Sequence, residues 1–252
     1  MKIAVLSPHR MDAALSLGLA VGSWLEQRHT VEVVNCFTRS EHAPFSDADS
    51  VHANDRMSFA SAVRKREDEA WQKLYRSAKL TLTDLNLKDA PLRLHCAPEE
   101  AFTVAVNPID KAFAKIHKAL ERSRAAALVF PLGLGGHVDR RIGLDAALAY
   151  TGTMPVAFYA DQPFAAQGSA VIEEHVQGLA ARLGAELTPV FASAAGDVEA
   201  AVERKRRLAL CYVSQLEDAQ VALVAGDVAR HGGRERLWAN AKWRELFASG
   251  VA

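Results

Sequence analysis

The chain has 252 residues, of which 50% are hydrophobic, and its 30 basic and 30 acidic side chains give a formal net charge of zero. This length can bury one large hydrophobic core and does not require a second domain. The balanced charge argues against a nucleic-acid-binding surface and against an acidic, solvating tail.

Short β-rich runs alternate with longer segments of helical periodicity, a pattern typical of βαβ units around a parallel sheet. The expected strands are residues 2–6, 30–37, 80–85, 126–130, 155–159 and 187–193. The expected helices are residues 12–26, 59–79, 108–122, 142–150, 170–183 and 198–216. Residues 38–54 are polar and are expected to form a long loop, of the kind that often serves as a lid. The pattern predicts one α/β domain over residues 1–252, Rossmann-like and doubly wound, with a mainly parallel sheet and helices on both faces.

The cysteines and the first residues bear on the cellular compartment. Cys36, Cys96 and Cys211 lie far apart, so they form neither a CxxC pair nor a disulfide framework. The first apolar run, residues 2–6, is too short for a signal peptide or a membrane span. We therefore expect a cytoplasmic protein that does not associate with membranes.

Two loops carry most of the residues with catalytic potential. Residues 7–12 follow the first expected strand, and residues 132–140 follow the fourth. In doubly wound sheets the strand order reverses beside the first strand, and ligands bind there at the carboxyl ends of the strands. If the fourth strand pairs with the first, the polar side chains of the two loops converge: His9, Asp12, His137 and Asp139.

Each of these residues also has a purely structural explanation. An aspartate that opens a helix is most often its N-cap, which would account for Asp12. A single loop histidine is usually a surface or packing residue. Gly133, Gly135 and Gly136 permit a left-handed backbone path before His137, but glycines are also common in any loop. It is the combination of two histidines and two aspartates on facing loops that favours a functional site.

The two loops resemble the motifs of the LmbE-like (PIG-L) family of zinc-dependent N-acetylglucosamine deacetylases. Residues 7–13 are similar to the first family motif, approximately A/S-x-H-P/L-D-D-E/A, and residues 137–140 are similar to the second, H-x-D-H. Four further segments resemble family patterns in the same order: residues 64–70 (R-x-x-E/D-x-x-A), 87–93 (LPDAxxR), 158–164 (YYEDLPY) and 205–216 (K…Y-x-SQ). The resemblance covers most of the chain and implies a Rossmann-like fold.

The resemblance also implies a zinc site with three protein ligands, of which this sequence keeps two. His9 and Asp12 match two ligands, but Arg140 stands where the family has the third, a histidine. Met11 stands where the family has the aspartate that acts as general base. A guanidinium has no lone pair for a metal, and a thioether is no base. Loss of a general base alone typically costs about 10²–10⁴-fold in rate.

We therefore expect Arg140 to place its guanidinium near the position that zinc takes in the family, in a bidentate pair with Asp12. His137 matches the family histidine that assists acid/base chemistry at the substrate carbonyl, and Asp139 follows it in the same motif. The candidate catalytic residues are then His137, Asp139 and Arg140. His9 and Asp12 are remnant metal ligands, and no cofactor is expected.

An alternative retains zinc. In that arrangement Arg140 points to solvent, and His9, Asp12 and His137 form a two-histidine, one-carboxylate site. Asp139 or Asp161 would then have to serve as the base, and neither stands at the position where the family has it.

Candidate substrate-binding residues are Arg66, Arg93 and Asp161, which are suited to contact a sugar or a carboxylate, although a solvated helix face explains the arginines equally well. The expected ligand is a small polar molecule similar to an N-acylated sugar, with no nucleic-acid or membrane partner and a homo-oligomer left open. We expect a divergent homologue without metal-dependent hydrolysis, which binds such a ligand or catalyses a metal-independent reaction. The alternatives are an active zinc-dependent N-acyl deacetylase, acting on C–N amide bonds, and a noncatalytic binding or partner subunit.

Overall fold

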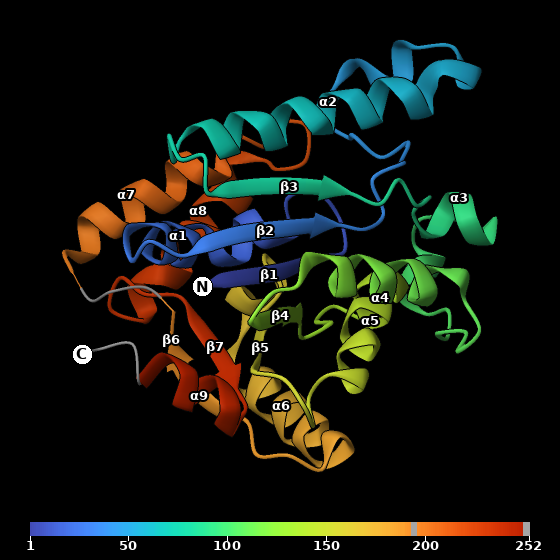
Figure 1. The fold of residues 1–252 in the computed structure, drawn as a ribbon. Helices are drawn as coiled ribbons and strands as arrows, with labels where there is room; N and C mark the ends of the chain where they lie inside the picture. The colour runs from blue at the N-terminus through green and yellow to red at the C-terminus, as the bar shows by residue number, and fades with distance from the viewer. Residues whose placement is uncertain (193–195, 249–252) are drawn as a thin grey trace.

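The computed structural model describes residues 1–192 and 196–248. Within these residues, a seven-stranded sheet of order β3-β2-β1-β4-β5-β7-β6 is flanked by helices (Figure 1). Its strands are β1 (Lys2–Ser7), β2 (Thr30–Asn35), β3 (Leu80–Asp84), β4 (Ala127–Pro131), β5 (Val156–Tyr159), β6 (Thr188–Phe191) and β7 (Arg236–Ala239). The α-helices are α1 (Asp12–Glu26), α2 (Ala53–Lys73), α3 (Ala90–Leu94), α4 (Lys111–Ser123), α5 (Val138–Ala146), α6 (Ser169–Leu183), α7 (Val198–Ala209), α8 (Asp218–Arg230) and α9 (Ala241–Ala248). Short 3₁₀ segments are η1 (Asp47–Ser50), η2 (Glu100–Phe102), η3 (Ala147–Ala149) and η4 (Phe164–Gln167).

The strand pairing places the two polar loops next to each other. β1 pairs in parallel with β2 on one side and with β4 on the other. β3 and β5 extend the parallel sheet, while β7 runs antiparallel to both β5 and β6. This confirms the expected α/β, mainly parallel sheet and the pairing of the fourth strand with the first. The loops after β1 and β4 therefore leave the same edge of the sheet side by side.

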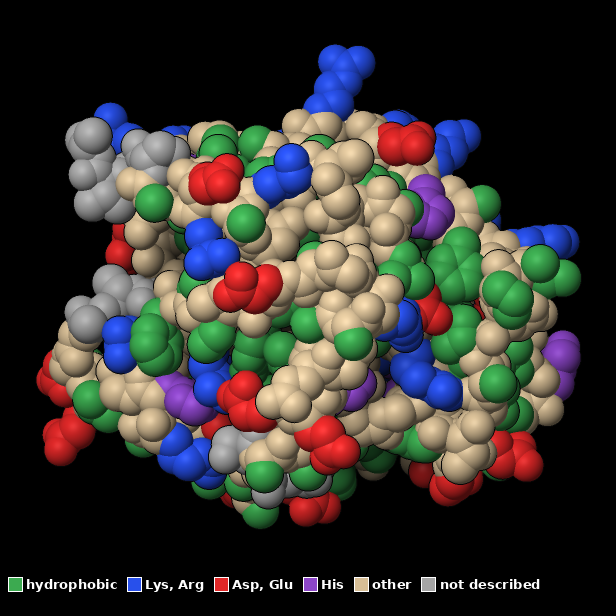
Figure 2. Space-filling view, turned by 90° about the horizontal axis from the view of Figure 1, so that it is seen from below, with side chains coloured by type: hydrophobic (Ala, Val, Ile, Leu, Met, Phe, Trp, Pro, Cys, Tyr) green, Lys and Arg blue, Asp and Glu red, His purple; other side chains and the backbone are tan. Residues whose placement is uncertain are grey.

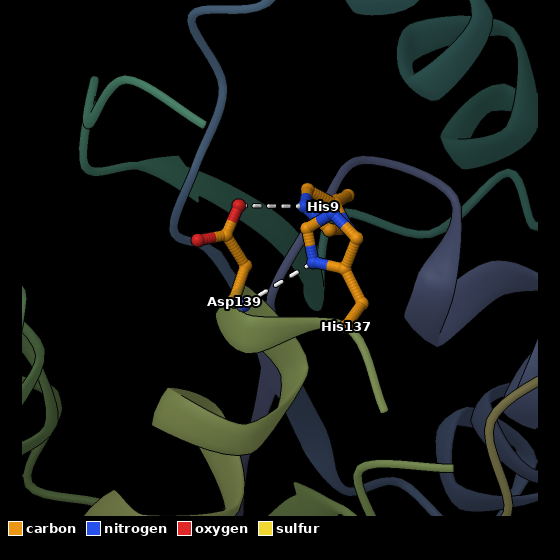
Figure 3. A group of neighbouring side chains, drawn as sticks. All are labelled: His9, His137 and Asp139. Carbon is orange, nitrogen blue, oxygen red and sulfur yellow. Dashed lines mark hydrogen bonds and ion pairs between the residues drawn. The ribbon is translucent and has the colours of Figure 1, made fainter. Parts of the chain in front are cut away.

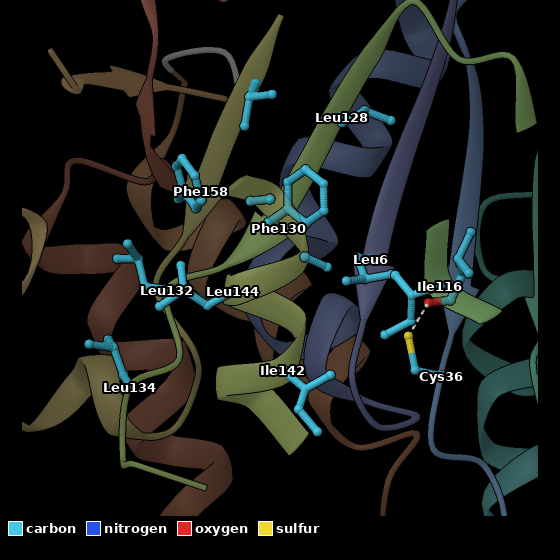
Figure 4. Packing of buried hydrophobic residues seen from close by; sticks show 14 of the residues in the cluster. Leu6, Cys36, Ile116, Leu128, Phe130, Leu132, Leu134, Ile142, Leu144 and Phe158 are labelled. Carbon is cyan, nitrogen blue, oxygen red and sulfur yellow. Dashed lines mark hydrogen bonds between the residues drawn. The ribbon is translucent and has the colours of Figure 1, made fainter. Parts of the chain in front are cut away.

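Alternating side chains of the central strands supply two hydrophobic cores, one on each face of the sheet. Ala4 and Leu6 of β1 pack with residues of α4, α5 and α6. Ile3 and Val5 of the same strand pack with residues of α1, α7 and α8. Figure 4 shows the first core around Leu6 and Phe130, with α5 packed against it. Both faces are covered, as the doubly wound prediction requires.

Several expected element boundaries were wrong. The helix expected at residues 59–79 begins at Ala53 and ends at Lys73, and the His52 side chain caps it by accepting a hydrogen bond from the Asn54 amide. The loop expected at residues 38–54 is accordingly shorter and contains η1. The helix expected at residues 198–216 ends at Ala209, and the following residues form turns before α8.

The C-terminal region contains elements that the sequence pattern did not predict. β7 is a four-residue antiparallel strand between β5 and β6, which makes β6 an edge strand. The last residue of the strand expected at residues 187–193 lies outside the described residues. Among those described, no helix is both long and apolar enough to cross a membrane. Figure 2 shows one face of the molecule, on which basic and acidic side chains are interspersed.

Candidate functional site

The polar residues that were expected to converge lie together at the carboxyl ends of β1 and β4. The His9 Nε2 atom is 3.0 Å from an Asp139 carboxylate oxygen, and the two groups point toward each other in Figure 3. The His9 and His137 rings meet edge to face, with centroids 4.8 Å apart. His9, Asp12 and Asp139 are buried, whereas His137 is half-buried. His137 is therefore the member of this group most open to a ligand.

The Arg140 guanidinium points inward and lies between two carboxylates. Its Nη2 atom donates to Asp12 Oδ1 at 2.8 Å, and its Nε atom lies 3.7 Å from Asp161 Oδ1. The Phe164 ring covers it, with a centroid 5.0 Å from the guanidinium carbon. The expected pairing with Asp12 is present, but it is not bidentate, because only Nη2 donates to Asp12, while Nε faces Asp161 without a hydrogen bond.

These contacts belong to a row of charged groups that alternate in sign, which we call the charge row. Its members, in spatial order, are Asp161, Arg140, Asp12, His9, Asp139, Arg93 and Asp110. Successive partners are separated by 3.7, 2.8, 3.2, 3.0, 2.8 and 2.9 Å. Each cation in the row therefore has a carboxylate on both sides, which offsets the cost of removing its charge from water.

The surroundings of each group set its protonation. Burial opposes the charged form of His9, but Asp12 and Asp139 on its two ring nitrogens outweigh that effect and raise its pKa. Burial likewise opposes ionisation of Asp12, but Arg140 and His9 hold its pKa well below the usual range. For Asp161, burial prevails over the nearby Arg140 charge and raises the pKa to about 7. The contacts in the centre of the row thus favour the charged forms of His9 and Asp12, whereas Asp161 at its end is only partly ionised at neutral pH.

His137 is held in one orientation by the backbone of α5. It is the N-cap of that helix, and its Nδ1 atom accepts a hydrogen bond from the Asp139 amide at 3.2 Å. Burial, together with the positive charge of His9, lowers the His137 pKa to about 3. The ring is therefore neutral at physiological pH, and the occupied Nδ1 leaves the proton on Nε2. It offers a ligand a neutral N–H donor.

Met11 occupies a backbone conformation that suits other residue types. It is the N-cap of α1 with a φ of 90° and makes no side-chain capping bond. Its side chain packs against the core on the α1 side of the sheet. Positive φ angles are disfavoured for most residues with a Cβ, and aspartate and asparagine adopt them more readily than methionine does. Asp12 is the first helical residue and not the N-cap, and its side chain accepts from the His9 amide.

The residues that could hold a metal differ from those that the family resemblance implies. The implied positions do not fit a cation, because Asp12 Oδ1 accepts from Arg140, and Asp12 Oδ2 accepts from the His9 amide. A different group, His9, His137 and Asp139, presents one ligand atom each, all within 4.8 Å of one another. Two imidazoles and a carboxylate are a donor set that zinc accepts. The expectation of no cofactor is therefore not supported, and zinc, the alternative, is possible here.

The three residues expected to bind substrate lie in different environments. Arg93 donates to Asp139 and Asp110, and its guanidinium lies 4.5 Å from the centre of the Phe37 ring. Asp161 is fully buried behind Arg140. Arg66 is exposed on α2.

The structure singles out Arg64, which the sequence reasoning did not select. Arg64 is buried on the inner face of α2 with Glu67, Asp68 and Trp71, and its Nη2 atom donates to the carbonyl of Arg10 at 3.2 Å. The sequence did contain a feature that could have identified Arg64, because Arg64 is the arginine that opens the R-x-x-E segment. Residues 64, 67, 68 and 71 also share one helical face.

No protein-family model and no curated protein matches the chain. Among solved structures, a deacetylase of the teicoplanin biosynthesis pathway aligns over 96% of this chain and 98% of its own, with 21% identity and a TM-score of 0.68. N,N′-diacetylchitobiose deacetylase from Pyrococcus horikoshii aligns over 94% and 83%, with 12% identity and a TM-score of 0.58. GalB from Pseudomonas putida, a 4-carboxy-2-hydroxymuconate hydratase, aligns over 95% of both chains, with 12% identity and a TM-score of 0.52. At these identities the likenesses establish the architecture, and the chain has the Rossmann-like α/β fold of the LmbE-like (PIG-L) deacetylases that its motifs resemble.

Proposed function

We propose that the protein is a divergent relative of the zinc-dependent N-acyl deacetylases in which a guanidinium takes the place of zinc. In this proposal the site binds a small polar, sugar-like ligand and does not carry out metal-dependent hydrolysis. The observation that carries the proposal is the buried contact of 2.8 Å between Arg140 and Asp12. The carboxylate of Asp12, which matches a zinc ligand of the family, is thereby paired with the guanidinium of Arg140.

In this proposal, repulsion between the two positive charges prevents a zinc ion from binding to His9 and Asp12 beside the Arg140 guanidinium. Two unit charges 4 Å apart interact by about 4 kcal/mol at the effective dielectric of a protein site, so a dication beside Arg140 is opposed by about twice that amount. Structural zinc binds with about 10–16 kcal/mol when four ligands are present. Only two of the three family ligands, His9 and Asp12, are present. We therefore expect this repulsion to prevent tight zinc binding between them.

The chemistry left to the site is that of a neutral hydrogen-bond donor beside an aromatic surface. His137 presents its Nε2–H, and the exposed Phe102 ring meets the His137 ring edge to face at 5.1 Å. A neutral imidazole can polarise a carbonyl without transferring a proton to it. An amide or hydroxyl oxygen of an N-acylated sugar fits this donor. The likeness to a hydratase supports the view that this fold carries reactions other than deacetylation.

Metal content provides the decisive experiment. The purified chain is incubated with zinc, dialysed and analysed, and we expect far less than one zinc per chain. The double variant Met11→Asp/Arg140→His, which restores the base and the third ligand, should bind one zinc per chain. Arg66→His, a substitution at an exposed position, is the matched control and should stay metal-free. Stoichiometric zinc in the unmodified chain, with hydrolysis of N-acetylglucosamine derivatives, would refute the proposal.

A second candidate function, zinc-dependent N-acyl hydrolysis, is favoured by the grouping of His9, His137 and Asp139. Zinc held there would polarise an amide carbonyl and lower the pKa of bound water. Asp139 is already engaged, because Arg93 donates to one of its oxygens and the Ala90 amide donates to the other. The His137→Ala variant distinguishes the two candidate functions. It abolishes zinc binding if His9, His137 and Asp139 hold the metal, and it has no zinc binding to abolish if the guanidinium takes the place of zinc.

A further inference from the structure

We propose that a groove between α2 and α7 binds a small molecule that carries at least two phosphate groups. Four cations line this groove, which we call the basic groove: Lys73, Arg76, Arg204 and Arg207. Leu74 and Leu208 add apolar surface, and no acid of the described residues lines it. The inference goes beyond the proposed function, because the basic groove lies away from the candidate site.

The basic groove lies at the opposite edge of the sheet from the candidate site. Lys73 ends α2, and Arg76 lies in the short connection from α2 to Leu80, the first residue of β3. β3, β2, β1 and β4 are parallel, so their amino ends share one edge, and their carboxyl ends, with the candidate site, share the other. Figure 1 shows α7 beside the end of α2 that precedes β3. The basic groove is therefore separate from the charge row.

The basic groove holds more positive charge than its surroundings offset. Among the described residues, no carboxylate oxygen lies within 4 Å of the charged nitrogens of Lys73, Arg76 or Arg207. Arg204 has one acidic neighbour, Glu26 at 3.6 Å, but Glu26 is 69% exposed, and such surface pairs contribute little. The carboxyl ends of α2 and α7 each add about half a negative charge. These ends offset about one of the four positive charges, so about three remain.

Helix ends attract basic residues in general, but this preference does not explain the missing acids. Elsewhere on the same two helices, Lys65 lies 3.9 Å from Glu69, and Arg206 lies 4.0 Å from Glu203. Arg206 is the neighbour of Arg207 in the sequence and is equally close to the end of α7. The cations that face the basic groove therefore differ from those that face away, and a ligand anion accounts for the difference.

The size and charge of the basic groove indicate the class of ligand. Its volume is about 360 Å³, within the range of roughly 300–1,000 Å³ that is typical of small-molecule sites. One phosphate group carries about two negative charges at neutral pH, so two phosphates match the remaining positive charge. Leu74 is 53% exposed and offers an apolar surface to the rest of such a molecule.

The backbone of α1 fixes the position of Arg204. A Cβ atom on Gly22 would lie 2.6 Å from Arg204 Nη2, so the guanidinium packs where a side chain would otherwise stand. The same Cβ would lie 3.5 Å from the ring of Tyr75, whose hydroxyl donates to the Gly18 carbonyl at 2.7 Å. A guanidinium matches phosphate oxygens through its planar fork, and one that is already held in place loses less freedom on binding.

Calorimetric titration of the full-length protein with pyrophosphate tests the proposal, because pyrophosphate is the smallest compound with two phosphate groups. Inorganic phosphate is titrated at matched ionic strength, so that screening is equal in both series. We expect saturable binding of pyrophosphate. Inorganic phosphate should bind at least about tenfold more weakly, since it makes fewer charge-assisted hydrogen bonds with the cations of the two helices.

Two adjacent arginines of α7 provide a matched pair of variants. Arg207→Gln removes a cation of the basic groove, and we expect it to weaken pyrophosphate binding by about tenfold. Arg206→Gln makes the same change outside the groove and should leave the dissociation constant within about twofold. Gly22→Ala keeps every charge but displaces the Arg204 guanidinium. It should weaken binding by about threefold without lowering the urea midpoint, because alanine is the better helix former.

Three results would overturn the proposal: no saturable binding of pyrophosphate, undiminished binding in Arg207→Gln, and an equal loss in Arg206→Gln. If polyglutamate or vesicles of phosphatidic acid bind and pyrophosphate does not, the groove serves an acidic protein or a membrane instead, and the proposal fails. Stoichiometric zinc in the metal analysis would refute the proposed function alone, because the basic groove and the charge row lie at opposite edges of the sheet.

Discussion

Replacement of Arg140 by glutamine tests whether its guanidinium neutralises the buried acids of the site. The change leaves Asp12, which is 1% exposed, with His9 as its remaining cationic partner within 4 Å in the described structure. It leaves Asp161 with no such partner there. Removal of one member of a buried ion pair costs about 3–5 kcal/mol, because the other charge stays buried without compensation. Since 1 kcal/mol corresponds to about 2–4 °C at this chain length, Tm should fall by roughly 6–20 °C.

The assay is urea unfolding at neutral pH in the presence of a chelator, so that metal binding does not contribute. Asp12→Asn and the double variant complete a cycle, in which the double loss should be smaller than the sum of the single losses by about 0.5–3 kcal/mol. Arg66→Gln, at an exposed position, should change the free energy of unfolding by no more than about 0.5 kcal/mol. A loss below about 1 kcal/mol for Arg140→Gln, or strict additivity with Asp12→Asn, would show that the guanidinium does not balance Asp12.

Three further predictions concern stability. Gly135 has a φ of +79°, and a Cβ there would lie 2.6 Å from the Phe164 ring. Gly135→Ala should therefore lower the free energy of unfolding by about 1–3 kcal/mol in urea. An unchanged urea midpoint would contradict this geometry. Arg124 ends α4 with a φ of 50°, so Arg124→Gly should gain about 0.5–1 kcal/mol, and a lower Tm would count against it. The raised pKa of Asp161 stabilises the fold below its unfolded pKa of about 4, and this contribution is lost as pH rises through about 7. The stability of the unmodified chain relative to Asp161→Asn should therefore decline over that pH range, whereas a pH-independent difference would refute the assignment.

The convergence of the two loops could be predicted because it depends on general rules of sheet topology. Residues 2–6 and 126–130 are largely apolar runs typical of buried strands, and parallel strands place their carboxyl ends at one edge. The pairing of Arg140 with Asp12 followed from charge balance, since a buried carboxylate needs a cation. The sharing of Arg140 with Asp161 depends on the rotamer and on the path of the loop after β5, which local patterns do not encode.

Which arginine of α2 is buried could not be predicted for a different reason. Arg64 and Arg66 are two positions apart, so they lie on opposite sides of a helix, and the rotation of the helix about its axis decides which of them is buried. The helix begins six residues earlier than its apolar pattern indicated, since a histidine side chain caps it. β7 was missed because its four residues are flanked by charged residues and glycines, and its pairing with β5 is long-range.

The backbone at Met11 bears on how this protein relates to metal-dependent chemistry. The loop has a left-handed turn at Met11, the position where the motif that it resembles carries an aspartate, and a methionine side chain has no acid–base group. Because aspartate tolerates that turn better than methionine, replacement of Met11 by aspartate is favoured by the conformational energy of the backbone. An acidic side chain at this position would therefore require a single substitution and no rebuilding of the loop.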